Sequence, residues 1–364
     1  MSFSRESYLK EAEAQHRSPE FIEVTLAYAD RLSAQDMPVI FSAKHLALVF
    51  ELKLYELRDI ADFRGRFYTF YSIRKRRGGV RQLSVPFSNV KKIQAWLHKM
   101  ILVKIPLEEA AMGFRSGRSI KQNATPHAGK KFVLNIDLLK FFDSITEYQV
   151  YKVFANAGYA ENLALEMAKI CTVPLSIDYY ASFSAKEQVL FKRNFERQIG
   201  VLPQGAPSSP ALANIIASGL DVKLSELAKS KGCTFTRYAD DITFSTDAYE
   251  QLPKFKELTG IIREAGFFVN WEKAKIFKSG QRQLVTGLTI THGVNVPKNY
   301  RKDVARHIHF CLKFGPEAHL LKIGNKEKKF YKDWLEGRIL YISSINPNAG
   351  KKLLSDFHRI KWPF

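Results

Sequence analysis

Apolar and polar residues follow patterns along the chain that predict a mixed helix and strand fold. The first 60 residues are mostly helix-like. Residues 64–86 read as two strands joined by a turn at Gly78-Gly79, and basic residues crowd that turn. A helix is expected next, with Ser88 as its N-cap. Its apolar positions recur at helical spacing and are Ile93, Trp96, Leu97, Met100 and Ile101.

The middle of the chain carries the clearest signals. Residues 130–145 begin as a buried strand and are expected to turn helical after Asp137. Residues 208–232 predict a long helix with Ser209 as N-cap, Pro210 at the first helical position and Gly232 at the end. One apolar stripe runs along it and comprises Leu212, Ile215, Ile216, Leu220, Leu224 and Leu227.

The stretch TFTRYADDITFS (234–245) predicts a hairpin, although two adjacent carboxylates interrupt its β-like run. Phe235, Ile242 and Phe244 are expected to anchor its two arms. A helix to about Gly266 follows, and residues 283–297 suggest a second hairpin that turns near His292-Gly293. The basic remainder of the chain is expected to be largely helical.

Composition and charge narrow the class of protein. The 364 residues suggest two or three lobes or one large enzyme, and 46% hydrophobic residues allow a sizeable core. Lys and Arg number 56 against 36 Asp and Glu, a net charge of +20. The excess is concentrated in Ser72–Lys131 and Lys298–Phe364, which favours a nucleic-acid partner over a merely solvated basic surface.

Other sequence features point to a cytoplasmic protein. No stretch approaches about 18 uninterrupted apolar residues, so we expect no membrane partner. The polar N-terminus lacks the apolar region of a secretory signal. Cys171, Cys233 and Cys311 are widely separated, which is typical of buried thiols in a reducing compartment.

Three carboxylates stand out as candidate metal ligands. Asp137 lies at the end of an apolar strand, and Asp240 and Asp241 lie at the tip of the predicted hairpin. Carboxylates at strand ends are often only turn formers or caps. In so basic a chain they also suit a hard-cation site, where two Mg²⁺ ions (or Mn²⁺) about 3.5–4 Å apart would support phosphoryl transfer. The residues alone leave both interpretations open.

The order of motifs decides between them: NIDLLKFFDSI (135–145), LPQGAPSSPALANI (202–215), YADD (238–241) and GFFVNWEKAKIF (266–277) follow one another in residues 64–297, which resemble the fingers and palm of reverse transcriptases. YADD fits the Tyr-x-Asp-Asp box of that family, and NIDLLKFFDSI (135–145) fits its first aspartate motif. LPQGAPSSPALANI (202–215) matches its Gln-Gly-x-x-x-Ser-Pro segment, and GFFVNWEKAKIF (266–277) matches the motif that follows. Four motifs in one order make a chance match very rare.

The resemblance implies a role for each matching residue. Asp137, Asp240 and Asp241 would hold the metals, with Asp241 more peripheral, and Lys273 is a candidate proton donor to pyrophosphate unless it is a solvated helix-end lysine. The dNTP would be bound by Arg74 (or Lys75), Arg81, Gln204 and Gly205. Phe142 would act as the steric gate against a 2′-hydroxyl; its alternative role is core packing, and Phe141 could be confused with it. Tyr238 would contact the primer end.

Two short elements resemble those of bacterial retron reverse transcriptases in particular. NATPH (123–127) is similar to an Asn-Ala-x-x-His element, and VTG (285–287) to a signature before the thumb. This resemblance implies that Asn123, His127, Val285, Thr286 and Gly287 act on the template-primer and on a cognate structured non-coding RNA. It also implies priming from an RNA 2′-hydroxyl, a branched RNA–DNA product, and anti-phage defence with an effector protein. Alternatively, His127 is an ordinary loop histidine and 285–287 an ordinary hairpin edge.

Several alternatives remain at this stage. They are a group II intron-like maturase, a diversity-generating enzyme, an abortive-infection polymerase that needs no template, and an inactive RNA-binding scaffold. A maturase would usually carry a longer thumb and a zinc-binding region. Residues 174–198 lengthen the link between two motifs. They are either a surface elaboration or a contact for RNA, single-stranded DNA or an effector, since they mix aromatic residues with Lys186, Lys192, Arg193 and Arg197.

The sequence therefore predicts an α+β right-hand polymerase. Residues 1–60 would form an N-terminal helical region, residues 61–297 the fingers and palm with an antiparallel sheet, and residues 298–364 a small basic helical thumb.

Overall fold

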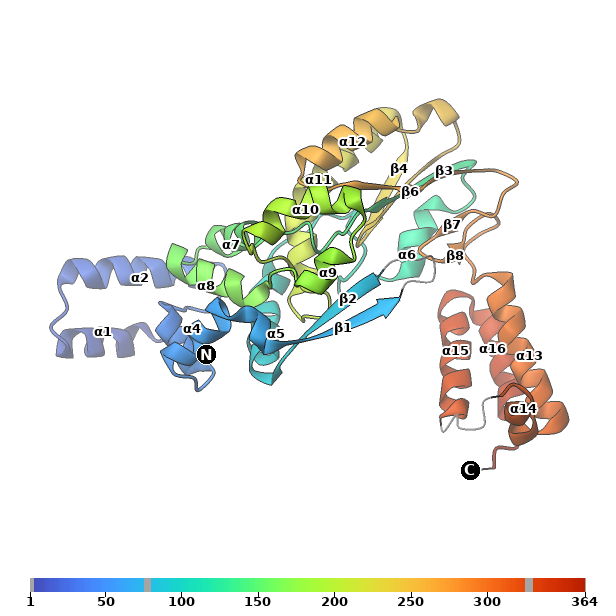
Figure 1. Ribbon diagram of the computed structural model, residues 1–364, viewed down its shortest axis with the longest axis horizontal. Helices are drawn as coiled ribbons and strands as arrows, with labels where there is room; N and C mark the ends of the chain where they lie inside the picture. Colours follow the sequence, from blue (N-terminus) through green and yellow to red (C-terminus); the bar gives the residue numbers. More distant parts are fainter. Residues whose placement is uncertain (1–2, 75–79, 325–329, 364) are drawn as a thin grey trace. The chain divides into compact units, whose positions relative to one another are not determined.

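The computed structural model describes residues 3–74, 80–324 and 330–363, and it divides into two compact units (Figure 1). Unit 1 runs to Arg115 and resumes over Leu138–Ser225 and Phe255–Asn270. Unit 2 comprises Ser116–Asp137, Glu226–Lys254 and the chain from Trp271 onward. The fingers, palm and thumb boundaries drawn from the sequence are a different division, and they stay a prediction.

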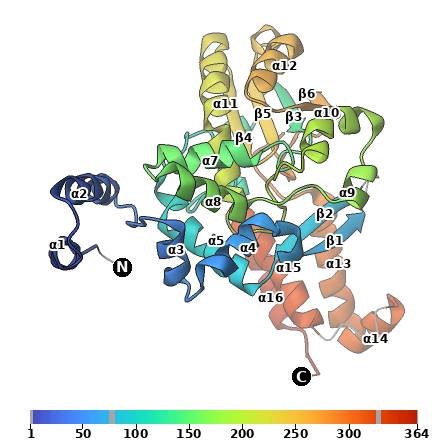
Figure 2. The ribbon, with the colours of Figure 1, turned by 60° about the vertical axis from the view of Figure 1, so that its left-hand side comes forward.

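Unit 1 begins with the helices that the sequence predicts. They are α1 (Arg5–Ala14), α2 (Pro19–Ala34), α3 (Ala43–Val49) and α4 (Leu54–Asp62). Three of these helices have a serine as N-cap, namely Ser4, Ser18 and Ser42. The serine side chain accepts a hydrogen bond from a backbone N–H of the first turn. The first two helices run side by side, which is clearest in Figure 2, where both are viewed nearly end-on.

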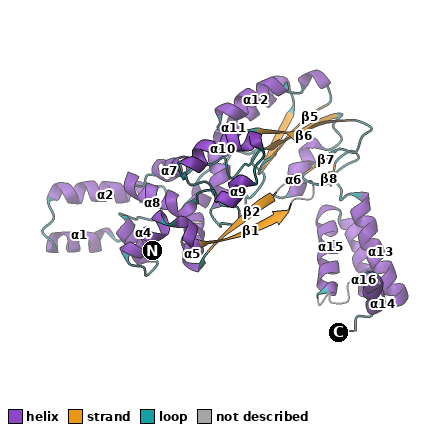
Figure 3. Cartoon of the chain, in the orientation of Figure 1, coloured by secondary structure: helices purple, strands orange, loops and turns teal. Residues whose placement is uncertain are grey.

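The predicted strand pair of residues 64–86 is confirmed. Strands β1 (Tyr68–Arg74) and β2 (Val80–Pro86) are antiparallel, with Tyr68 opposite Pro86 and Arg74 opposite Val80 (Figure 3). The turn predicted at Gly78-Gly79 lies outside the described residues. Helix α5 (Ser88–Met100) follows, but its N-cap is Phe87 and Ser88 is already helical, so the predicted Ser88 cap was wrong.

The rest of unit 1 is helical. Its helices are α7 (Glu147–Asn156), α8 (Glu161–Cys171), α9 (Ile177–Ala181), α10 (Ala185–Glu196), α12 (Phe255–Glu264) and α11 (Ser209–Lys231), which continues into unit 2. Helix α11 begins at Ser209 itself, so the predicted cap was one residue late. It ends as predicted, because Gly232 follows with φ of +67°.

Unit 2 is built on a four-stranded sheet with the order β4-β5-β3-β6. Its strands are β3 (Phe132–Leu138), β4 (Thr234–Tyr238), β5 (Asp241–Thr246) and β6 (Val269–Lys278). Strand β5 is antiparallel to both β3 and β4. The helix expected after Asp137 was wrong: the chain makes turns from residue 139 to 144, and Lys140 has a φ of +49°.

A small two-stranded ribbon follows the sheet. Strands β7 (Leu284–Val285) and β8 (Leu288–Thr289) pair across a tight turn at Thr286-Gly287, so the turn predicted near His292-Gly293 is not the turn of this ribbon. The chain reverses again around His292-Gly293, where Thr289 and Asn295 exchange backbone hydrogen bonds of 2.8 and 2.9 Å. Both glycines have a positive φ, which suits a turn.

The C-terminal part is helical, as predicted, with α13 (Lys298–Phe314), α14 (Pro316–Lys322), α15 (Tyr331–Ile345) and α16 (Pro347–His358). One apolar cluster joins these helices to the ribbon and sheet of the same unit, and it includes Val133, Val285, Leu288, Val304 and Leu335. Burial of such side chains is the main stabilising contribution to the unit. Shorter elements are helix α6 (Ile120–Ala124) and the 3₁₀ turns Arg64–Phe67, Leu102–Lys104, Thr125–His127 and Tyr249–Gln251.

Two further predictions concern the chain as a whole. Within the described residues, no helix combines the length and the apolar character needed to cross a bilayer. All three cysteines are free; Cys171 and Cys311 are buried as predicted, whereas Cys233 is only half-buried.

Candidate active site

The YADD residues form the tip of the β4–β5 hairpin. Tyr238 and Asp241 face each other as the last pair of the ladder, so Ala239 and Asp240 make a two-residue turn. Ala239 has a φ of +57°, an unfavourable conformation for a residue with a side chain. The fully buried Arg237 stabilises it by donating a hydrogen bond of 3.0 Å to the Ala239 carbonyl oxygen.

The role of Arg237 in stabilising this turn was not predicted from the sequence. An arginine inside an apolar strand, two residues from a turn, was the available signal, because a fully buried guanidinium must find acceptors nearby.

Asp137 and Asp241 are brought together by strand register. They are directly opposite each other in the antiparallel β3–β5 pair, and side chains of opposite residues lie on one face of a sheet. Asp137 is almost buried, at 7% exposure, whereas Asp240 is half-buried and Asp241 is open to solvent at the hairpin tip. The three carboxylates of the sequence motif therefore lie at one end of the sheet.

The electrostatics of this end reflect crowded negative charge. Although Asp241 is an exposed residue, the many protein atoms around its carboxylate partly desolvate it, and this desolvation, together with the carboxylates of Asp240 and Asp137, raises the pKa of Asp241 to about 7. The positive charge of Lys273 lowers the pKa of Asp241 and so offsets part of this rise. Like charges placed opposite each other in a sheet are destabilising, so this arrangement calls for a cation.

Lys273 provides part of that positive charge. It belongs to strand β6, next to β3, and its Nζ lies 2.8 Å from both carboxylate oxygens of Asp137. The alternative of a solvated lysine at a helix end was wrong, because the residue lies in a strand. Its side chain is 47% exposed, so the ammonium is also accessible from solvent.

The chemistry of this donor set fits a divalent cation. Carboxylate oxygens are the ligands that Mg²⁺ prefers, and it keeps several waters or takes substrate phosphates as the other ligands. Within the described part of the chain, no group of three or more His, Cys, Asp or Glu side chains is placed so that it could already hold a metal ion. Asp137, Asp240 and Asp241, which we call the carboxylate cluster, thus lie at one end of the sheet without forming a preformed metal site.

In unit 1, the Gln204-Gly205 turn lies against strand β2. The backbone N–H of Ser84 donates a hydrogen bond of 2.7 Å to the Gln204 carbonyl oxygen. Gly205 has a φ of +119°, and a Cβ added there would lie 3.1 Å from the Ser84 carbonyl oxygen. Only glycine suits this close approach of two backbones.

The two neighbouring phenylalanines of the first aspartate motif are in different surroundings. Phe141 is buried and packs against Phe267, with ring centroids 5.4 Å apart. Phe142 is half-buried and lies near Phe114, at 6.2 Å between centroids. Of the two rings, Phe142 is therefore the one with surface left to meet a ligand.

The predicted phosphate-binding arginines are exposed residues of the β1–β2 ribbon. Arg74 is opposite Val80, and Arg81 is opposite Ile73. Because side chains alternate along a strand, this register directs Arg74 and Arg81 to opposite faces of the ribbon. A ligand on one face would meet only one of them. Lys75 lies outside the described residues.

The two retron-like elements contact each other in unit 2. Asn123 is buried, and its Nδ2 donates a hydrogen bond of 3.4 Å to Thr286 Oγ1, so NATPH and VTG are joined. Thr286 has a φ of +44°, which is strained for a β-branched residue, and Gly287 follows with +80°. Val285 is fully buried in the core of the unit.

His127 is also fully buried. Its Nδ1 is 2.7 Å from Ser245 Oγ and its Nε2 is 2.9 Å from Thr236 Oγ1, so both ring nitrogens are hydrogen-bonded. Burial lowers the pKa of His127 to about 4. Asn123, His127 and Val285 are therefore buried residues of the core, whereas Thr286 is half-buried and Gly287 is exposed at the turn.

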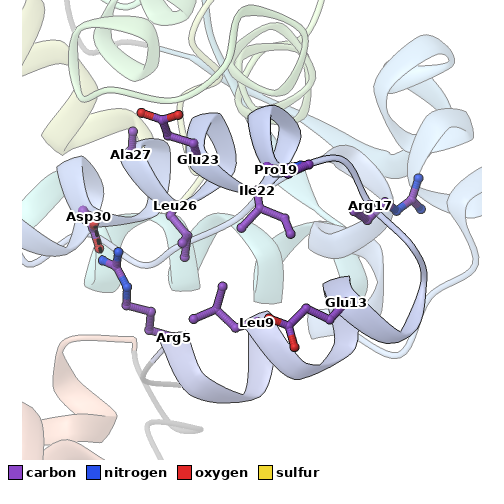
Figure 4. Close-up of a pocket in the computed structure, with 10 residues that line it drawn as sticks. All are labelled: Arg5, Leu9, Glu13, Arg17, Pro19, Ile22, Glu23, Leu26, Ala27 and Asp30. Atoms are coloured by element: carbon purple, nitrogen blue, oxygen red, sulfur yellow. Dashed lines mark hydrogen bonds and ion pairs between the residues drawn. The ribbon is translucent and has the colours of Figure 1, made fainter.

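A separate groove of about 640 Å³ lies between α1 and α2 (Figure 4). Leu9, Ile22 and Leu26 line its floor, and an ion pair of 2.7 Å between Arg5 and Asp30 closes one end. Both ion-pair side chains are more than half exposed, so this pair contributes little to stability. The groove contains none of the predicted site residues.

Comparison with known proteins identifies the class. Residues 73–299 match the family model "Reverse transcriptase (RNA-dependent DNA polymerase)". The chain therefore belongs to the reverse transcriptase family, whose members are RNA-directed DNA polymerases.

Relatives within the family narrow the identification to the bacterial retron type. The chain is 33% identical to the retron Mx65 reverse transcriptase of Myxococcus xanthus over 80% of this chain and 64% of that protein. It is 31% identical to the retron Ec86 reverse transcriptase of Escherichia coli over 89% of this chain and 96% of that protein. With the retron Mx162 reverse transcriptase of M. xanthus, identity is 29% over 91% of this chain and 70% of that protein.

Proposed function

We propose that the protein copies its own structured non-coding RNA into single-stranded DNA by nucleotidyl transfer at the carboxylate cluster. The observation that carries the proposal is the alignment of Asp137 with Asp241 across two strands, with Asp240 beside them at the hairpin tip. So much negative charge at one point, in a chain of net charge +20, serves no evident purpose in packing.

In this proposal, Asp137 and Asp240 are the main ligands for two Mg²⁺ ions, with Mn²⁺ as the alternative, and Asp241 adds negative charge. When bound, the ions activate the primer hydroxyl and stabilise charge on the leaving pyrophosphate. Lys273 holds Asp137 in place and has an accessible ammonium that can donate a proton to pyrophosphate. Tyr238, at the end of β4, supports the primer terminus.

The dNTP substrates are bound by residues of unit 1 in the same proposal. Arg81 or Arg74 pairs with the triphosphate, because a guanidinium binds phosphate with two hydrogen bonds. Gln204 and Gly205 meet the base, and Phe142 excludes a 2′-hydroxyl. The half-buried position of the Phe142 ring supports this choice over Phe141.

Primer extension on an RNA template tests the catalytic part. We expect Asp240→Asn to lower the rate of dNTP incorporation by at least about 100-fold, because it removes a charged metal ligand. Asp247→Asn is the matched control, since Asp247 follows β5 on the surface, where its carboxylate accepts hydrogen bonds from Lys130 Nζ and from the Lys131 backbone N–H. Equal rates for Asp240→Asn and the control would contradict the proposal.

The retron-specific part concerns the RNA. We infer that Thr286 and Gly287 touch a cognate non-coding RNA, that synthesis starts from a 2′-hydroxyl of that RNA, and that the product is a branched RNA–DNA. The strained turn at Thr286 supports a functional role, because strain of this kind tends to persist at ligand sites. We further propose that the protein acts in the cytoplasm together with an effector protein, in defence against phage.

Sequencing the nucleic acid that co-purifies with the protein tests this part. We expect a short RNA joined through a 2′-oxygen to single-stranded DNA. Intron-derived RNA without branched DNA would favour a maturase, and DNA made when RNA is left out of the assay would favour an abortive-infection type of polymerase.

A further inference from the structure

Residues 174–198 fold into a small compact region of unit 1. Its buried apolar residues Leu175, Tyr179, Phe183 and Phe191 form one cluster with Val201, which lies just beyond the region. Tyr180 and Phe195 stack beside it, with ring centroids 4.0 Å apart. These rings are occupied with one another, so they are poorly placed to stack on nucleic-acid bases.

Helix α9 reaches the turn that carries Phe142. The Tyr179 hydroxyl donates a hydrogen bond of 2.8 Å to Oδ2 of Asp143, a carboxylate with only 4% exposure next to Phe142 in the chain. Burial and the Asp143 carboxylate raise the pKa of Tyr179, which keeps its hydroxyl protonated as a donor. A hydrogen bond to a buried charged acceptor is among the stronger ones in proteins.

The same turn is held from its other end by Lys140. Its Nζ lies 3.6 Å from the ring centroid of Phe183 and 3.5 Å from the Tyr179 hydroxyl. The Lys140 side chain is 7% exposed, so this cation–π contact is largely shielded from water. Residues of the 174–198 region thus fix positions on both sides of Phe142.

Helix α9 also reaches strand β2. The Ser176 hydroxyl donates a hydrogen bond of 3.0 Å to Oε1 of the buried Gln82. Gln82 is next to Arg81, and two residues further on the Ser84 N–H binds the Gln204 carbonyl oxygen. Arg81 in turn lies close enough for its charge to act on Tyr179. Helix α9 and its N-cap therefore contact two of the three sequence segments that carry the predicted dNTP residues, and the third, Gln204-Gly205, is hydrogen-bonded to strand β2.

We propose that residues 174–198 are an internal brace for the nucleotide-binding residues, in which Tyr179 and Ser176 set the positions of the Phe142 turn and of strand β2. This inference rests on the proposed function. A steric gate works by contact distance, so a small displacement of its turn changes selection between dNTP and rNTP. Tyr179 and Ser176 are positioning residues, because they act through Phe142, Gln82 and Gln204.

Tyr179→Phe tests the brace, since it removes one hydroxyl and keeps the ring in the cluster. We expect KM for dTTP on a poly(rA)·oligo(dT) template-primer to rise about tenfold, and the preference for dTTP over UTP to fall by a similar factor. We expect kcat to change by less than about threefold, because the carboxylate cluster is untouched.

Tyr180→Phe is the matched control. The Tyr180 hydroxyl donates a hydrogen bond of 2.8 Å to the Gln188 carbonyl oxygen, within the 174–198 region. Its loss removes the same chemical group from the same cluster but no link to the Phe142 turn. We expect Tyr180→Phe to have the same KM for dTTP and the same preference for dTTP over UTP as the parent.

A second pair of variants keeps the inference testable if Tyr179→Phe does not fold. Ser176 and Ser184 are both helix N-caps, accepting from the N–H of Tyr179 and of Glu187 respectively. Of the two, Ser176 also binds Gln82. Ser176→Ala is expected to raise KM for dTTP, whereas Ser184→Ala leaves it at the parental value.

The results separate this inference from the proposed function. If the parent extends the primer while Tyr179→Phe and Ser176→Ala keep parental KM and selectivity, the brace is wrong and the proposed function stands. The same rise in KM and the same loss of dTTP preference in all four variants would also overturn the brace, because they would indicate general destabilisation. A parent that incorporates no dTTP would overturn both proposals.

Discussion

His127 illustrates how a single residue can look functional in the sequence and lie in the core of the structure. Its ring is fully buried between Ser245 and Thr236, and both nitrogens are bonded to hydroxyl oxygens. A neutral ring satisfies this arrangement, because a hydroxyl can donate to one nitrogen and accept from the other. Protonation would place an unpaired charge in the core.

This environment predicts a pH dependence of stability. The pKa of His127 is about 4 in the folded protein against 6.5 for an ordinary histidine, so only the unfolded chain binds a proton between these values. The free energy of unfolding should therefore fall as the pH drops from about 6.5 to about 4, by up to roughly 3 kcal/mol from this residue. Above about pH 6.5 the residue makes no pH-dependent contribution.

Urea unfolding of His127→Gln at pH 7 and pH 4.5 measures this contribution. The variant should be less stable than the parent at pH 7, but it should lose less stability on acidification. His292→Gln, which changes an exposed histidine, is the control and should keep the parental pH dependence. A parental pH dependence in His127→Gln would show that the ring is not buried in solution.

At the scale of secondary-structure elements, the crossing of α15 and α16 depends on one glycine. Gly350 of α16 is buried, and a Cβ there would overlap the side chain and backbone of Ser343 in α15. Gly337 of α15 is exposed, and a Cβ there would meet no described atom within 4 Å.

These two glycines give opposite predictions for the same substitution. Gly350→Ala should destabilise the protein by about 1–3 kcal/mol, since the two helices must move apart. Gly337→Ala should stabilise it by up to about 1 kcal/mol through helix propensity. Thermal unfolding measures both. A Tm for Gly350→Ala at or above that of the parent would contradict the close helix contact.

The elements that could be predicted from the sequence are those with strong local signals. Helix α11 and the β4–β5 hairpin have an apolar pattern with a clear turn or glycine at the end, and both are present. The turn of the β7–β8 ribbon was misplaced because Gly287 and Gly293 offer two equally good local turns. Only the pairing of Val285 with Leu288 decides between them.

The candidate site was predictable to a similar extent. Motif order identified Asp137, Asp240 and Asp241 as one group, and strand pairing brings Asp137 and Asp241 opposite each other. The opposite faces of Arg74 and Arg81 depend on strand register, which the basic turn alone does not reveal. The links from Tyr179 to Asp143 and from Ser176 to Gln82 join residues 36 and 94 positions apart, which no local pattern indicates.

At the scale of the whole molecule, each unit carries a different part of the proposed chemistry. The carboxylate cluster and the turn at Thr286 belong to unit 2, and the predicted dNTP residues belong to unit 1. A net charge of +20 suits binding to a polyanion through many phosphate contacts. Removing one carboxylate should thus leave RNA binding nearly unchanged and affect only the chemistry.

The most direct test is the rate of dNTP incorporation by Asp137→Asn, with RNA affinity measured on the same preparation. We predict RNA affinity within about twofold of the parent, because the binding surface stays basic. We predict incorporation at least about 100-fold slower than the parent on an RNA template, because in the proposed function Asp137 is one of the two main metal ligands. Incorporation at the parental rate by Asp137→Asn would contradict the carboxylate cluster as the catalytic centre.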